Sequence, residues 1–154
     1  MYEMEPKLLE KIQNAMRLLD SETKEHSYRV AQLAYMNTLQ LIKPEMNEYV
    51  YQLALAHDLY EDTDIPRDTF SGQFNDDLLL LTRNNEEEYL DYIRRIDNAR
   101  DTSPAYIVKI ADLIDHLTKR DTLKESLKER YIKALVIFCP GLEGIDLTGD
   151  SALY

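Results

Sequence analysis

Residues 104–119 read PAYIVKIADLIDHLTK, and their pattern indicates the fold class. The apolar residues recur at steps of three and four, the spacing of one face of an α-helix; they are Ile107, Ile110, Ala111, Ile114 and Leu117. Pro104 stands where the helix would open, since proline is tolerated at the first helical position. We therefore expect a helix over residues 104–119 that carries Asp112, a carboxylate, inside its apolar stripe.

The rest of the chain repeats this pattern. Helical spacing of apolar residues predicts further helices over residues 5–19, from Asp20 or Ser21 to about Leu41, from Pro44 onward, and over 74–82, 85–95 and 123–138. Residues 63–73 are expected to form a connection with a short turn at 66–70. The chain has four glycines, three of them after residue 140, which disfavours a succession of β-hairpins. We predict an all-α fold: a single compact domain of six to seven helices over residues 1–139, with a Gly-rich tail over 140–154.

Composition excludes several classes of protein. The 154 residues carry 18 Lys and Arg against 29 Asp and Glu, a formal net charge of −11 that disfavours binding to nucleic acid or anionic membranes. No apolar run approaches the ~20 residues of a membrane span. The first residues lack the features of a secretory signal, and the single Cys139 cannot form an internal disulfide. We expect a cytoplasmic protein, and the sequence leaves a homodimer open.

The chain has only three histidines, and each lies in a predicted helix beside acidic residues. In residues 56–63, AHDLYEDT, one helical turn separates His57 from Glu61 and Asp58 from Asp62, so these groups are expected to project from one sector. Burying four such groups without partners would be costly. The pattern therefore predicts that they surround a cavity filled by water or by a metal ion.

Two further polar residues interrupt apolar helical faces in the same way, His26 and Asp112. Together with His57 and Asp58 they offer two imidazoles and two carboxylates from three helices. Such a mixed nitrogen and oxygen donor set suits a borderline divalent cation such as Mn²⁺, Fe²⁺ or Zn²⁺, with Mg²⁺ as a further option.

The motifs AHDLYEDT (56–63) and VKIAD (108–112), preceded by a lone histidine, resemble those of the HD-domain metal-dependent phosphohydrolases. More narrowly, they are similar to the hydrolase domain of the RelA/SpoT-type alarmone enzymes and its small stand-alone relatives, where the motifs read HDxxEDT and K-[LI]-A-D. The resemblance spans residues 8–137.

This resemblance implies a manganese-dependent hydrolase that removes the 3′-diphosphate of guanosine 3′,5′-bis(diphosphate) as pyrophosphate. It implies that His26, His57, Asp58 and Asp112 bind the metal. It further implies that Glu61 and Asp62 are the acidic pair that positions and activates the attacking water.

The chain departs from the family at two places, both in the part that contacts the substrate in the family and neither among the implied metal ligands. The Gly-rich loop that contacts the nucleotide in the family is shortened here to residues 20–25, DSETKE. The asparagine that touches substrate in the family is replaced by His116. The metal site is therefore expected to transfer to this chain, whereas guanine specificity is not.

Phosphoryl transfer also needs cations near the developing negative charge, and the candidates are Arg29, Arg83 and Lys109. Taken alone, Arg29 and Arg83 each fit an ordinary surface ion pair better than a contact with phosphate. His116 shares the face of Asp112 one turn away, so it could contact substrate, metal or solvent.

Each predicted ligand also has an ordinary structural explanation. His26 could be a core histidine bonded to a carbonyl, and Asp112 could pair with an arginine. At the level of function, three hypotheses follow: an alarmone-type pyrophosphohydrolase, a nucleotidase or phosphatase acting on another small phosphoester, or a non-catalytic nucleotide-binding module.

Overall fold

The computed structural model describes residues 4–40, 44–118 and 123–143, and all of its regular secondary structure in these ranges is helical, which confirms the all-α prediction. The elements in chain order are α1 (Leu8–Met16), α2 (Ser21–Gln40), the 3₁₀ turn η1 (Pro44–Met46), α3 (Asn47–Ala56), α4 (Leu59–Asp62), α5 (Gly72–Leu80), α6 (Tyr89–Asn98), α7 (Ala105–Thr118), α8 (Glu125–Phe138) and the 3₁₀ turn η3 (Pro140–Leu142). None of the described helices is both long enough and apolar enough to cross a membrane.

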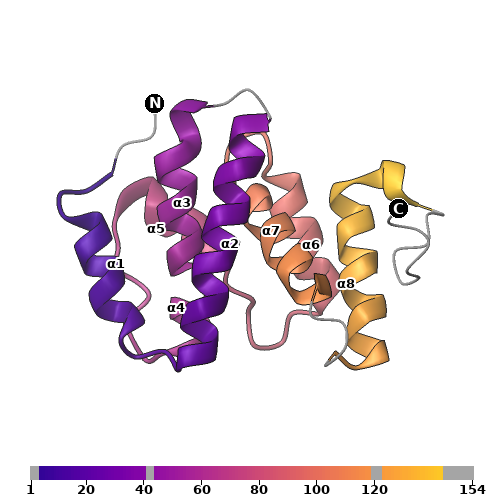
Figure 1. Ribbon diagram of the computed structural model, residues 1–154, viewed down its shortest axis with the longest axis horizontal. Coiled ribbons are helices and arrows are strands. Elements are labelled where there is room, and N and C mark those ends of the chain that lie inside the picture. The colour runs from indigo at the N-terminus through magenta and orange to yellow at the C-terminus, as the bar shows by residue number, and fades with distance from the viewer. Residues whose placement is uncertain (1–3, 41–43, 119–122, 144–154) are drawn as a thin grey trace.

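The helices form a bundle built around α2, α3 and α7. α2 runs beside α3 and also packs against α7, while α1 lies against α3 at one end of the bundle and α8 lies against α6 and α7 at the other (Figure 1). One cluster of buried apolar side chains extends through these helices, and its largest fully buried members include Tyr49, Phe70, Tyr92 and Phe138. α7 therefore has packing partners on several sides.

The burial of α7 extends well beyond its predicted stripe. Ile107, Val108, Ala111 and Leu113 are buried, whereas Ile110 and Ile114 are only half-buried. The reason is that α2 and α3 cover one part of the helix surface and α8 covers another. As a result, the same helix also withdraws charged residues from water, and these form part of the site described below.

The start of α2 is set by Asp20, as the sequence predicts. Its Oδ1 accepts a hydrogen bond from the backbone N–H of Thr23 at 2.7 Å, which satisfies one of the amides left free at the first turn. Because this cap follows α1 after a short turn, residues 21–25 are already helical rather than a loop. His26 consequently lies in the second turn of α2.

The helix expected from Pro44 through the His-Asp pair is interrupted at that pair. α3 ends at Ala56, and a separate single turn, α4, begins at Leu59. The backbone N–H of His57 bonds to the carbonyl of Ala54 at 3.2 Å, three residues back, and the side-chain Nδ1 of His57 donates to the same carbonyl at 2.6 Å. The competing side-chain donor occupies the acceptor and ends the regular helical pattern there.

The prediction of a helix over 85–95 is wrong at its start, because α6 begins at Tyr89. Residues 84–87 form a turn closed by the N–H of Glu87 on the carbonyl of Asn84 at 3.1 Å. The Glu87 carboxylate does not sit in a first helical turn but accepts two hydrogen bonds from Arg95, both at 2.9 Å. The acidic run therefore builds the turn that precedes the helix.

Other boundaries differ from the predictions by a few residues: the first helix is shorter than 5–19, and α5 begins two residues before 74. The turn at 66–70 is confirmed by the hydrogen bond from the N–H of Thr69 to the carbonyl of Pro66 at 3.0 Å. The predicted irregular tail opens with η3, and residues 144–154 lie outside the described part of the chain. Cys139 is a free thiol packed beside the core.

Candidate metal centre

Three segments far apart in sequence bring the four predicted metal ligands together. His26 comes from α2, His57 and Asp58 from the junction of α3 and α4, and Asp112 from α7. His26 Nε2 lies 2.8 Å from Asp112 Oδ1, and His57 Nε2 lies 3.2 Å from Asp58 Oδ2 and 3.4 Å from Asp112 Oδ1. The fourth histidine–aspartate pair, His26 Nε2 and Asp58 Oδ2, is 3.9 Å apart.

These separations suit atoms that share one cation. Metal–ligand bonds to nitrogen and oxygen are about 2.0–2.2 Å long, so neighbouring donors on one ion lie about 3 Å apart. His57 adds a second indication: its Nε2 is buried and has no hydrogen-bond partner among the described residues, while its Nδ1 is held by the Ala54 carbonyl. A metal ion among these atoms would satisfy that nitrogen, so the donor set fits a divalent cation.

Asp115 holds the ring of His26 in place, a role that the sequence analysis missed. His26 Nδ1 donates to Asp115 Oδ2 at 2.6 Å, which leaves Nε2 turned toward Asp112. Asp115 in turn accepts hydrogen bonds from Arg29 Nε at 2.9 Å and Nη2 at 3.1 Å. A carboxylate behind a ligating histidine orients the ring and raises its basicity. The signal in the sequence was the spacing, because Asp115 lies three residues after Asp112 on the same helix.

Arg29, predicted as a contact for phosphate, is thus engaged by a carboxylate. The charge of Asp115 raises the pKa of Arg29, mainly through their hydrogen bonds. Burial would raise the pKa of Asp115, but the bonds from Arg29 and His26 outweigh it and lower that pKa. The geometry places Arg29 behind the cluster rather than free to meet a substrate.

The ordinary explanations for His26 and Asp112 are only partly met. His26 bonds to two carboxylates and not to a carbonyl; it is His57 that bonds to a carbonyl. Asp112 does have a cationic partner, but it is Lys109, whose Nζ lies 2.7 Å from Oδ2. The other oxygen of Asp112, Oδ1, remains for the histidines.

Charge inside the cluster is tightly balanced. Burial would raise the pKa of Asp112, yet the ammonium of Lys109 outweighs burial and holds it well below its usual range. Burial would lower the pKa of His57, but the charge of Asp58 and the contact with Asp112 raise it to about 9. For His26 the same competition, with Asp112 as the main opposing partner, also raises the pKa. The carboxylates therefore demand positive charge between them, as imidazole protons or as a metal ion that replaces those protons.

A cavity of about 170 Å³ opens beside the cluster, and we call it the Arg130 cavity. Its lining includes three cations, Arg83, Lys109 and Arg130, and it also includes Glu61. Arg130 lies with its guanidinium carbon 3.9 Å from the centre of the Tyr89 ring. Both Arg130 Nε and the Tyr89 hydroxyl are buried without a hydrogen-bond partner among the described residues. These donors are available to an anion.

Arg130, Tyr89 and Tyr131 were missed by the sequence analysis. They come from α8 and from the start of α6, and only the packing of these helices against α7 brings them to the cluster. Arg83, by contrast, was predicted and does line this cavity. Its Nε donates to the carbonyl of Glu87 at 2.8 Å, and its backbone N–H donates to Glu61 Oε1 at 3.2 Å.

A second cavity of about 280 Å³ also reaches the cluster, and we call it the Glu22 cavity. Its charged lining consists of four carboxylates and Arg29; the carboxylates are Glu22, Asp58, Asp62 and Asp115. Asp58 and His116 line both cavities. The four-residue cluster thus separates a cavity in which three cations face three carboxylates from one that is mainly anionic.

Glu61 and Asp62, expected to act as a pair from one sector, line different cavities. Glu61 lines the Arg130 cavity and Asp62 the Glu22 cavity, because consecutive positions of the single turn α4 face different sides. Both residues keep exposed surface, but the neighbouring protein removes part of the water around their carboxylates and raises the pKa of each. Of this acidic pair, Glu61 and not Asp62 therefore shares a cavity with Arg83, Lys109 and Arg130.

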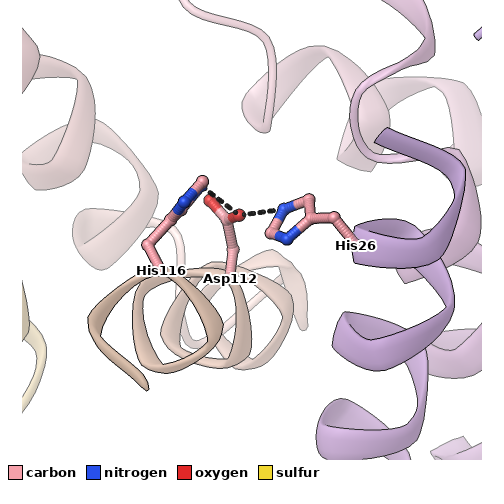
Figure 2. A group of neighbouring side chains, drawn as sticks. All are labelled: His26, Asp112 and His116. Atoms are coloured by element: carbon pink, nitrogen blue, oxygen red, sulfur yellow. Dashed lines mark hydrogen bonds and ion pairs between the residues drawn. The ribbon is translucent and has the colours of Figure 1, made fainter. Parts of the chain in front are cut away.

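His116 lies beside Asp112, as their spacing on α7 predicts. Its Nε2 is 3.3 Å from Asp112 Oδ1, the oxygen that also faces His26 (Figure 2). Its ring stacks on Tyr131 of α8, with ring centres 5.0 Å apart.

Comparisons of the chain with protein-family models, with curated proteins and with solved structures gave no match. The relation to HD-domain phosphohydrolases therefore remains a prediction that rests on the two motifs.

Proposed function

We propose that the chain is a metal-dependent phosphohydrolase that acts on a small nucleotide phosphate or diphosphate. The observation that carries this proposal is the convergence of His26, His57, Asp58 and Asp112 at the edge of a cavity that offers unpaired cationic and hydroxyl donors. A carboxylate-rich cluster without cations nearby would repel phosphate, whereas the Arg130 cavity supplies them on one side.

A bound divalent cation would lower the pKa of a water molecule and neutralise a phosphoryl oxygen. The side chains of the cavity then have separate tasks. Arg83 and Arg130 bind the phosphate oxygens and stabilise the negative charge that grows on them as water adds to phosphorus and the ester bond breaks. Glu61 accepts the proton that the water releases and returns it to the departing ester oxygen, because its carboxylate lies in the same cavity and burial raises its pKa.

The preferred substrate within this class is an alarmone-type 3′-diphosphate, and this choice rests on the HDxxEDT and KIAD motifs. A specific observation favours a second candidate, a nucleotidase or phosphatase for another small phosphoester. Residues 21–25 belong to α2, so the loop that contacts the nucleotide in the family has no counterpart here.

A substrate panel with reconstituted protein tests both candidates. Protein stripped of metal is loaded with Mn²⁺, Fe²⁺, Zn²⁺ or Mg²⁺ and offered guanosine 3′,5′-bis(diphosphate), nucleoside monophosphates and a generic phosphoester. Release of pyrophosphate from the first substrate supports the alarmone hydrolase, and release of inorganic phosphate from the others supports the second candidate. Binding of nucleotide without turnover under any metal would instead favour the non-catalytic module and contradict the proposal.

Glu61→Ala is the decisive variant in this panel. We expect it to retain metal and to lose turnover, because Glu61 lies in the cavity but has no contact with the ligand cluster. Asp64→Ala is the matched control, since Asp64 is an exposed acidic residue just after α4 and lines neither cavity. Normal turnover in Glu61→Ala would refute its role as the base.

A further inference from the structure

Three imidazole nitrogens surround a single oxygen of Asp112. Its Oδ1 lies 2.8 Å from His26 Nε2, 3.4 Å from His57 Nε2 and 3.3 Å from His116 Nε2. Figure 2 shows two of these rings, His26 from α2 and His116 from α7, reaching the same carboxylate oxygen from different sides. His116 Nε2 is therefore as close to Asp112 Oδ1 as His57 Nε2 is.

The chemistry of the three rings favours a shared cation. His26 and His57 each use Nδ1–H elsewhere, on Asp115 and on the Ala54 carbonyl, so in the neutral rings Nε2 carries a lone pair. Lone pairs that converge on a carboxylate repel one another unless positive charge lies between them. His116 Nε2 joins this convergence and lies within ligand-sharing distance of His26 and Asp112.

The position of the His116 ring also suits ligation. Asp112 and His116 are four residues apart on α7, a spacing at which two side chains of one helix face can hold the same ion. The ring stacks on Tyr131 at an interplanar angle of 21°, which restrains its plane, and its centre lies 4.6 Å from that of His26. The His116 side chain is 37% exposed, so it lies at the open side of the cluster, between the two cavities.

We propose that His116 is a fifth donor to the metal ion, so that the site consists of three imidazoles and two carboxylates. This inference rests on the proposed metal site and goes beyond it, because the motifs assign only four ligands. A third imidazole shifts the preference toward the later first-row cations, in the order Mn²⁺ < Fe²⁺ < Co²⁺. The site is therefore expected to bind Fe²⁺, Co²⁺ or Zn²⁺ in preference to Mn²⁺ and Mg²⁺.

The test is titration of metal-free protein with Co²⁺, followed by visible absorption and by calorimetry, without any assay of activity. Wild-type protein is expected to bind one equivalent. His116→Asn is expected to bind Co²⁺ at least about tenfold more weakly, with a changed absorption spectrum, since one donor is lost. Proton NMR of the Co²⁺ protein provides a count, with one strongly shifted exchangeable N–H signal per ligating imidazole: three in the wild type and two in the variant.

A second variant keeps the test informative if His116→Asn unfolds. His116→Cys places a thiolate at the same position, and a sulfur-to-cobalt charge-transfer band appears only if the side chain at 116 reaches the ion. Cys139 is present in every variant and provides the background.

The failure of this inference can be told apart from failure of the metal site. If His57→Ala abolishes Co²⁺ binding while His116→Asn binds with unchanged affinity and spectrum, the four-ligand site stands and the role of His116 is refuted. If the wild type binds no Co²⁺, both proposals are overturned.

Discussion

The Arg130 cavity and the Glu22 cavity share Asp58 and His116 in their linings but differ in their balance of charge. In the first, three cations (Arg83, Lys109 and Arg130) face three carboxylates (Asp58, Glu61 and Asp112). The second combines four carboxylates with one arginine that is already bound to Asp115. A phosphate group is therefore repelled less on the Arg130 side of the cluster than on the Glu22 side. Under the proposed function we therefore expect the substrate to enter through the Arg130 cavity, whereas the Glu22 cavity contains the groups that hold His26.

The largest effect on turnover is expected from substitution of Asp58, which lines both cavities and is a candidate metal ligand. Asp58→Asn should lose metal and lower turnover by about 10³-fold or more, since the ion supplies several kcal/mol of transition-state stabilisation. Metal content by elemental analysis and turnover are measured together. Asp64→Asn serves as the control. If the Asp58→Asn protein keeps its full metal content, Asp58 is not a metal ligand.

The two acidic residues of α4 test the direction of the site. Glu61→Gln should retain metal and lower kcat by about 10²-fold or more, as expected for loss of a general base. Asp62→Asn should lower kcat by less than about tenfold, because Asp62 faces the Glu22 cavity. If the two effects are reversed, the attacking water lies on the other side of the cluster and our assignment of the cavities is wrong.

Arg130 and Arg29, one from each cavity, test the same difference between the cavities through a different measurement. Arg130→Gln should raise KM by about 10- to 100-fold at saturating metal, the loss of a charged hydrogen bond to phosphate. Arg29→Gln should leave that KM unchanged and weaken metal binding by about tenfold, because Arg29 supports Asp115 behind His26. A rise in KM for Arg29→Gln without loss of metal affinity would restore its predicted contact with substrate.

The smallest effect concerns Asp77, a buried carboxylate that lines neither cavity. It accepts hydrogen bonds from Tyr49 at 2.5 Å and Ser103 at 2.6 Å, and burial raises its pKa despite these bonds. Because the folded-state pKa lies above the unfolded value of about 3.9, the folded chain takes up this proton first as pH falls.

The free energy of unfolding of the wild type should therefore rise relative to that of Asp77→Asn as pH falls through the folded pKa toward about 3.9. At neutral pH the two proteins should differ by about 1 kcal/mol, the net value of one hydrogen bond. Thermal or urea unfolding at several pH values measures the difference. A constant difference would mean that Asp77 ionises alike in both states, and activity should not respond to this change.

Helical periodicity predicted most of the fold, because apolar faces at 3.6-residue spacing are a local property of the chain. It failed where a side chain competes with the backbone. Glu87 builds a turn with Arg95 instead of opening α6, and the Nδ1 of His57 occupies a carbonyl that a continuous helix would use. Both events depend on partners that periodicity does not see.

The convergence of the four candidate ligands was predictable from three helices because each polar residue interrupts an apolar stripe. Asp115 was within reach of the same reasoning, since it follows Asp112 by three residues on α7. Arg130 was not, because α8 is assigned to the site only by its packing against α6 and α7. The separation of Glu61 from Asp62 likewise depends on where each cavity lies, which the spacing of the motif does not state.

The short interruption between α3 and α4 brings the side chains of two adjacent residues, His57 and Asp58, within the separation of atoms that share one ion. In an unbroken α-helix, neighbours along the chain point about 100° apart. Here His57 Nε2 and Asp58 Oδ2 approach to 3.2 Å, at the place where the helical ladder is interrupted by the Ala54 carbonyl. The same two residues placed in the middle of a regular helix would therefore not bring these two atoms together. A designed copy of this arrangement would have to include the Ala54 carbonyl and the helix end that it marks.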